Sequence, residues 1–210
     1  MYKRQGEWAS GGIGPHDIKR MGDTLIVANG GIQTDPKDRT KLNLDTMRPN
    51  LTQLSLTGHV LAQSELPEWL QNSIRHLALV GGGVAFAMQW EGDPVEAPPL
   101  LGLWTPGSAP ILCPAPEEEA FRMKGYAGSI AMTADLIAIT SPKGGVAMIF
   151  DFNGTYLAIH ERPDICGIVA LPSGGFLATD GIGGLSRLEA TSLTRVSQTA
   201  VSWDNHIVAI

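Results

Sequence analysis

The sequence contains few cysteines. Only two of its 210 residues are cysteine, Cys113 and Cys166, and they lie far apart with neither in a CxxC pair. A zinc knuckle and a thioredoxin-like redox motif both depend on such a pair. The sequence therefore excludes these two kinds of site.

Long apolar runs and an excess of positive charge are missing as well. No run approaches the roughly 18–20 apolar residues that a membrane span requires. The N-terminal MYKRQGEWAS has two basic residues without an apolar stretch after them, so it is not a signal peptide. Lys and Arg number 15 against 21 Asp and Glu, which gives a net charge of −6. Such a surface does not attract nucleic acid or anionic lipid, and we expect neither as a partner.

Helical periodicity is nearly absent, and short β-type runs take its place. The best helical candidate is EEEAFRMKG at residues 117–125. Elsewhere 25 glycines and 14 prolines separate short apolar runs. Many short strands with turn signals between them indicate an all-β fold. The runs are TLIVAN (24–29), LTQLSL (51–56), GVAFAMQW (83–90), LIAIT (136–140), GVAMIFDF (145–152), TYLAIH (155–160) and GFLAT (175–179).

A repeated entry segment organises these runs. In five places a polar or small pair precedes an apolar strand, and a turn, a second strand, a polar loop and a hairpin then follow in the complete copies. Four antiparallel strands in about 40–45 residues are typical of a β-propeller blade. The entry segments are PHDIKR (15–20), RHLALV (75–80), GSIAMT (128–133), CGIVAL (166–171) and NHIVAI (205–210).

We therefore predict one partial β-propeller domain over residues 1–210. Insertions at 33–50 and 92–99, each after a second strand, account for the two longer blades. An open propeller leaves unpaired sheet edges, so we expect the chain to be a C-terminal portion of a longer propeller. The predicted parts are an outer strand at 1–9, four complete blades at about 15–70, 74–116, 127–163 and 165–202, and an inner strand at 205–210.

The motifs resemble those of a known family. GEWASGGIGPHDI, VANGGIQT, KLNLDTMRPNL, SIRHLAL, GYAGSIAM, TSPKGGV, DICG and WDNH together are similar to the domain of unknown function 1513 family, over essentially the whole chain. The resemblance implies a seven-bladed propeller with further blades before Met1. It also implies a twin-arginine export signal, a periplasmic location and a place beside iron-acquisition genes. This chain lacks that signal, and the family supplies no established activity.

Three of the five histidines occupy equivalent positions in the repeat. The first strand of each propeller blade lines the central channel, and His16, His76 and His206 each precede such a strand by the same step. The period of two in a strand aims them in the same direction. From the sequence we favour a structural ring in which these histidines hydrogen-bond between blades. The alternative is a transition-metal site, because neutral imidazoles bind Zn, Cu, Fe and Ni, and Cys166 would add a soft ligand.

Other side chains are expected at the same channel mouth. Some neighbour the entry histidines, others lie on the first insertion, and one lies on a loop that enters the binding face. The candidate ligand-binding residues are Arg75, Asp204, Asn205, Asn43, Arg48 and Trp90, with Asp45 beside them on the insertion.

Three functions fit this pattern. The first is a periplasmic binding propeller that acts in metal acquisition, with iron as the expected metal. The second is a lactonase-like hydrolase in which a channel-mouth histidine acts as general base or as ligand of a metal that activates water. The third is a non-catalytic scaffold that binds a periplasmic partner protein on its loop face.

Overall fold

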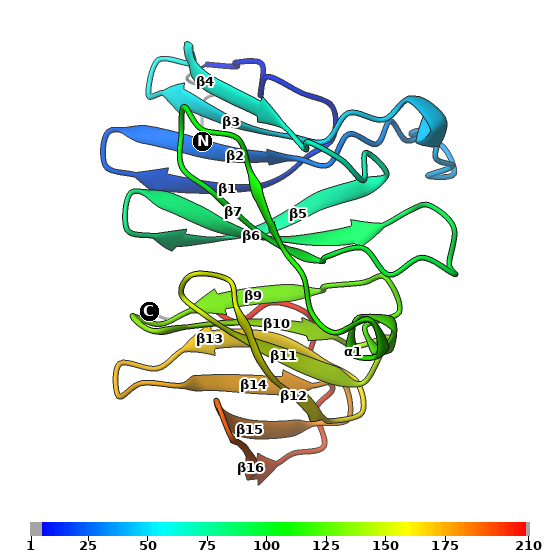
Figure 1. The fold of residues 1–210 in the computed structure, drawn as a ribbon, viewed down its shortest axis with the longest axis vertical. Helices are drawn as coiled ribbons and strands as arrows, with labels where there is room; N and C mark the ends of the chain where they lie inside the picture. Colours follow the sequence, from blue (N-terminus) through cyan, green and yellow to red (C-terminus); the bar gives the residue numbers. More distant parts are fainter. Residues whose placement is uncertain (1–5, 209–210) are drawn as a thin grey trace, which may run out of the picture.

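A computed structural model describes residues 6–208 of the chain. Their sixteen strands form four antiparallel sheets of four strands each, which confirms the all-β prediction. The sheets follow one another along the long axis of the molecule, as the colours in Figure 1 show. In each sheet the strands are hydrogen-bonded in chain order, as in the blades of a propeller.

The four sheets have the following strands. The first contains β1 (Pro15–Met21), β2 (Thr24–Asn29), β3 (Asn50–Ser55) and β4 (Val60–Glu65). The second contains β5 (Asn72–Val80), β6 (Gly83–Trp90), β7 (Leu101–Trp104) and β8 (Ile111–Cys113). The third contains β9 (Ser129–Met132), β10 (Leu136–Ser141), β11 (Val146–Asp151) and β12 (Tyr156–Glu161). The fourth contains β13 (Ile165–Ala170), β14 (Phe176–Asp180), β15 (Gly184–Glu189) and β16 (Ser192–Gln198).

The first strands of the sheets face one another. β1 contacts β5, β5 contacts β9, and β9 contacts β13. Both insertions expected from the sequence follow second strands, between β2 and β3 and between β6 and β7. The first carries a 3-10 helix (Leu44–Thr46), and the helical candidate forms α1 (Glu117–Arg122) between the second and third sheets. No helix in residues 6–208 is long and apolar enough to cross a membrane.

The core lies between the sheets. β6 is buried over six consecutive residues because neighbouring sheets cover both of its faces. At Gly102 of β7 an added Cβ would lie 2.2 Å from the ring of Phe86, so only glycine allows this close approach. One cluster of buried side chains extends over the first three sheets, and a smaller one, with Ile149 and Phe176, joins the third to the fourth.

The described parts of the two terminal segments form no strand. Residues 6–14 and 199–208 are irregular, whereas the sequence predicted strands at 1–9 and 205–210. Residues 1–5 and 209–210 lie outside the described part. A strand needs a hydrogen-bonded neighbour, and each sheet is already made of its own four strands. Instead Trp8 packs on Gly58, and Ile207 packs on Gly167 of the inner strand β13.

Candidate functional site

Irregularities in strand pairing mark the entry segments. The register between β1 and β2 shifts between Pro15 and Asp17, so that His16 bulges from the ladder. β5 has the same kind of shift at Arg75, between Ile74 and His76. Bulges redirect side chains and are frequent beside functional sites. At His16 and next to His76, the inner strands β1 and β5 thus leave regular pairing.

The three histidines converge. The ring centroids of His16 and His76 are 4.8 Å apart, and those of His76 and His206 are 4.9 Å apart. The rings meet edge to face, at interplanar angles of 88° and 61°. They come from β1, β5 and the C-terminal segment, and they line a cavity of about 300 Å³. Its other lining residues include Lys19, Leu77, Ser129, Ile130 and Ile168.

Hydrogen bonds between β1 and β5 fix the orientation of His16. Its Nδ1 lies 3.0 Å from the carbonyl oxygen of Arg75. A carbonyl only accepts, so Nδ1 carries the proton and Nε2 of the neutral ring keeps its lone pair. Beside it, the Asp17 carboxylate accepts a hydrogen bond from the backbone N–H of Leu77 at 2.9 Å. These two contacts join neighbouring sheets, as the structural reading of the histidines expects.

The surroundings lower the pKa values of His16 and His76. Burial, the neighbouring His16 and His206, and the positive charges of Arg75 and Lys19 lower the pKa of His76 to about 3. Loss of hydration, followed by the charge of Arg75, also lowers the pKa of His16, although the hydrogen bond to the Arg75 carbonyl opposes this. At neutral pH His76 therefore keeps the lone pair that a metal ion or a hydrogen-bond donor needs.

The guanidinium of Arg75, the residue before His76, has few hydrogen-bond partners. Its side chain is 18% exposed, and its Nη2 lies 3.5 Å from Glu91 Oε1. Lys41, on the first insertion, forms the closer ion pair with the same carboxylate. The Nε of Arg75 is buried and makes no hydrogen bond within residues 6–208. The insertion thus reaches the rim through Lys41 and Glu91, two residues that the sequence did not single out.

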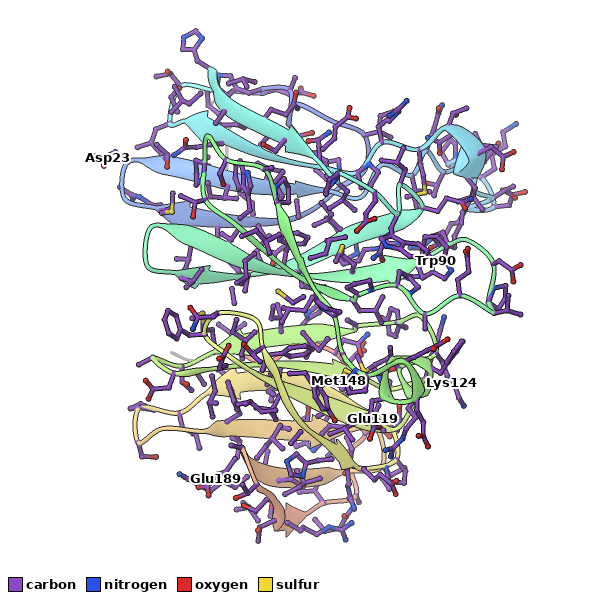
Figure 2. The ribbon with its side chains drawn as sticks, viewed as in Figure 1. Asp23, Trp90, Glu119, Lys124, Met148 and Glu189 are labelled. Carbon is purple, nitrogen blue, oxygen red and sulfur yellow. The ribbon has the colours of Figure 1, made fainter. Side chains whose placement is uncertain are left out.

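Three predicted ligand-binding residues have other partners. Asn43 donates to the carbonyl of Gly31 at 2.9 Å and accepts from the N–H of Gln33, so it closes the base of the insertion. Arg48 reaches Glu65 on the outer strand β4 at 3.5 Å. Trp90 donates to the carbonyl of Asp93 and packs edge to face against Trp69. Figure 2 shows Trp90 and Asp23 at opposite ends of the strands.

Cys166, which the sequence indicated as a candidate metal ligand, is not among the residues that line the histidine cavity. Its Sγ lies 3.5 Å from the carbonyl of Thr179 and 3.7 Å from that of Trp203. The residue is 3% exposed, and burial raises the pKa of its thiol. Across the part of the chain that the structure describes, no group of three or more His, Cys, Asp or Glu side chains is placed so that it could hold a metal ion.

The C-terminal segment is held by an aromatic residue that sequence reasoning missed. The side-chain amide of Asn205 donates to the hydroxyl of Tyr126 at 3.2 Å, and Lys143 lies 5.0 Å above the Tyr126 ring. Asp204 is exposed and accepts the backbone N–H of Asn205. Tyr126 stands three residues before Ser129, at an entry segment, and this position was the available signal.

The sequence matches a family model over its whole length. The model, described as "Protein of unknown function (DUF1513)", covers residues 1–210. The chain belongs to this family. The match agrees with the resemblance carried by the entry motifs, and no curated protein matches the sequence significantly.

Solved structures similar to this DUF1513 chain share its fold at low identity. The computationally designed Ika8 protein has a TM-score of 0.61 at 9% identity, over 90% of this chain and 50% of its own. A streptogramin B lyase has 0.55 at 15%, over 87% and 54%. The Neurospora crassa Pan2 WD40 domain has 0.50 at 10%, over 90% and 53%. The DUF1513 chain thus has a propeller-like fold and spans about half the length of these structures.

Proposed function

We propose that this DUF1513 chain belongs to a binding propeller that holds a transition-metal ion at the cluster of His16, His76 and His206. The observation that carries the proposal is the convergence of three imidazoles from separate segments. The ring centroid of His76 lies 4.8 Å from that of His16 and 4.9 Å from that of His206. Imidazole nitrogen donors suit Zn, Cu, Ni and Fe. Coordination requires the rings to rotate from edge-to-face contact until their nitrogens point to one centre.

The hydrogen bonding of His16 supports a ligand role. Histidines that bind metals commonly donate their other ring N–H to a carbonyl or carboxylate, which fixes the tautomer. His16 has this arrangement, because Nδ1–H donates to the Arg75 carbonyl and leaves Nε2 as the donor atom. The same contact would also serve a purely structural role, so the metal must be measured directly.

The low pKa of His76 favours binding over hydrolysis. A general base works best when its pKa lies near the working pH. His76 has a pKa of about 3, so it is a weak base at neutral pH, although its lone pair remains available to a metal. A lactonase-like role for this side chain is therefore the less favoured hypothesis.

Equilibrium dialysis against Zn²⁺ tests the proposal. The purified protein should retain one zinc per chain, and His76→Ala should weaken retention at least tenfold, because it removes the central imidazole. His59→Ala is the matched control, since His59 is exposed in the turn between β3 and β4 and should leave retention unchanged. Unchanged zinc binding by His76→Ala would show that the cluster is structural and would favour the scaffold reading.

We further propose a periplasmic location, a role in iron acquisition and a seven-bladed ring for the whole protein. The support is the resemblance to the family, which implies all three. Fractionation of the producing cells tests the location, because recovery of the protein in the cytosol alone would contradict it. A structure of the longest natural chain would count the blades.

A further inference from the structure

The third sheet shows how a sheet inside the row is covered. Successive residues of a strand point to opposite faces. In β11, Met148 and Phe150 belong to the core cluster that extends over the first three sheets, whereas Ala147 and Ile149 belong to the cluster shared with the fourth. Both faces of this sheet are therefore apolar, and each is covered by a neighbouring sheet.

The first sheet has only one face covered in this way. Ile26 and Ala28 of β2 are fully buried in the shared core cluster. The alternating residues Leu25 and Val27 line the apolar cavity of about 350 Å³ on the opposite face, together with Ile18, which is 53% exposed. Because these side chains occupy the face that an inner sheet presents to its neighbour, the cavity has the character of an uncovered sheet interface.

The fourth sheet has an open face on its other side. Phe176 and Ala178 of β14 are buried against the third sheet. Leu177, between them, is half-buried and faces away, and so does Val169, its partner across the β13–β14 pair. Figure 1 shows the first and fourth sheets at opposite ends of the row. The described residues thus form a row of four sheets with one apolar face open at each end.

The two open faces continue an interface that already exists in the molecule. Inner strands pack in the same order between successive sheets, β1 on β5, β5 on β9 and β9 on β13. A fourth sheet placed on the open face of a first sheet repeats that order once more. Interfaces between unlike faces give either closed rings or open chains, depending on the rotation between copies. The row matches 50% of the Ika8 chain at a TM-score of 0.61, which favours closure by two copies.

We propose that the open face of the first sheet binds the open face of the fourth sheet of a second copy of this chain. Two copies of four sheets then close one ring of eight, with both open faces of each copy buried. The inference concerns the 210-residue chain and does not depend on metal binding. The second copy would pack next to His16, because His16 lines both the apolar cavity and the histidine cavity.

Sedimentation equilibrium of the 210-residue chain, alone and in mixtures of variants, tests the inference. Wild type should reach twice the 22.3 kDa of one chain and rise no further with concentration. Ile18→Arg on the first sheet and Leu177→Arg on the fourth should each weaken association at least tenfold, because each places an unpaired charge in the interface. Leu157→Arg is the control, since Leu157 is 47% exposed on the third sheet and should leave the mass unchanged.

Mixing the two arginine variants gives the decisive measurement. Ile18→Arg keeps an intact fourth sheet and Leu177→Arg an intact first sheet, so an equimolar mixture should regain the two-chain mass that neither variant reaches alone. An interface between two first sheets would instead leave Leu177→Arg associated as wild type is, and that result overturns the inference. A mixture that stays monomeric, a wild-type mass that rises without limit, or a wild-type monomer at every concentration overturns it as well.

Circular dichroism of each variant ensures that a loss of association is read only from folded protein. Ile18 is already half exposed, so arginine should be tolerated there. If Leu177→Arg does not fold, Val169→Arg on the same face takes its place and should behave in the same way, alone and in the mixture.

Discussion

A single position, repeated in the chain, determines most of the chemistry at this site. His16 and His76 occupy the same step before their inner strands, and bulges at or next to them turn their side chains away from regular pairing. His76 lies between the other two imidazoles and loses the most hydration. Its protonation therefore affects the stability of the fold.

Stability should fall on acidification, and His76 should account for part of the loss. The unfolded chain binds a proton at His76 below its ordinary pKa of 6.5, whereas the folded chain does so only near pH 3. Between these values the unfolded state holds more protons, so the free energy of unfolding decreases as the pH falls. For this half-buried group we expect a loss of about 1–2 kcal/mol between pH 7.5 and pH 5.

Urea denaturation of dilute protein, followed by tryptophan fluorescence at several pH values, measures this dependence. His76→Gln should flatten it, since glutamine does not titrate. His59→Gln, in the exposed β3–β4 turn, should keep the wild-type slope. Equal slopes for wild type and His76→Gln would disprove the assignment.

Asp17 should contribute to stability through its contact between sheets. Asp17→Ala removes the acceptor of the Leu77 N–H, a charge-assisted hydrogen bond at 2.9 Å, and should cost about 1–2 kcal/mol. Asp23→Ala is the matched control, because the Asp23 side chain is 96% exposed and should matter by less than about 0.5 kcal/mol. Similar midpoints of urea unfolding for the two variants would argue against a role for this contact.

At the scale of elements, a buried ion pair joins the third and fourth sheets. Arg162, between β12 and β13, lies 2.5 Å from Asp180 at the end of β14, and Asp180 is 1% exposed. The other carboxylate oxygen of Asp180 accepts the N–H groups of Ile182 and Gly184, which shapes the turn into β15. The pair thus fixes the connection between two sheets and the turn beside it.

Arg162→Ala should destabilise the protein strongly. It leaves the Asp180 carboxylate buried without its cation, which typically costs about 3–5 kcal/mol. The exposed pair of Arg187 and Glu189, 2.7 Å apart, provides the control, and Arg187→Ala should cost about 0.5 kcal/mol or less. Thermal unfolding distinguishes the two, and a loss of similar size in both variants would refute the argument.

At the scale of the whole molecule, the terminal sheets carry exposed apolar side chains. On the first sheet Ile18 is 53% exposed and Leu61 55%, and on the fourth Val196 is 58% exposed. An apolar cavity of about 350 Å³ lies against the first sheet, lined by Trp8, Ile18 and Leu25 among others. In a closed ring, neighbouring blades cover such faces.

The 210-residue chain by itself should therefore self-associate as its concentration rises. Light scattering during size-exclusion chromatography measures this, and Ile18→Ser combined with Leu61→Ser should reduce it. Leu157→Ser provides the comparison, because Leu157 is 47% exposed on the third sheet, which has a sheet on either side. A monodisperse monomer at every concentration would contradict the prediction.

The sequence by itself determined the fold class and the position of the histidines. Strand periodicity, turn residues and the repeated entry segment are local features, and they sufficed to predict four-stranded sheets and to align His16 with His76. The irregular terminal segments were not predictable in the same way, because the pattern of Asn205–Ile210 is that of a strand, whereas strand formation requires a neighbour that the local sequence does not encode.

Only the tertiary structure decided which side chains meet around the histidines. Cys166 shares an aligned segment with them but turns to Thr179, and Asn43 closes its own loop. Glu91, which directly follows β6, pairs with Arg75 and with Lys41 of the first insertion. These outcomes depend on bulges, on the twist between sheets and on the path of each insertion. Each of these is set by packing between residues distant in the chain, and a local pattern carries no information about such distances.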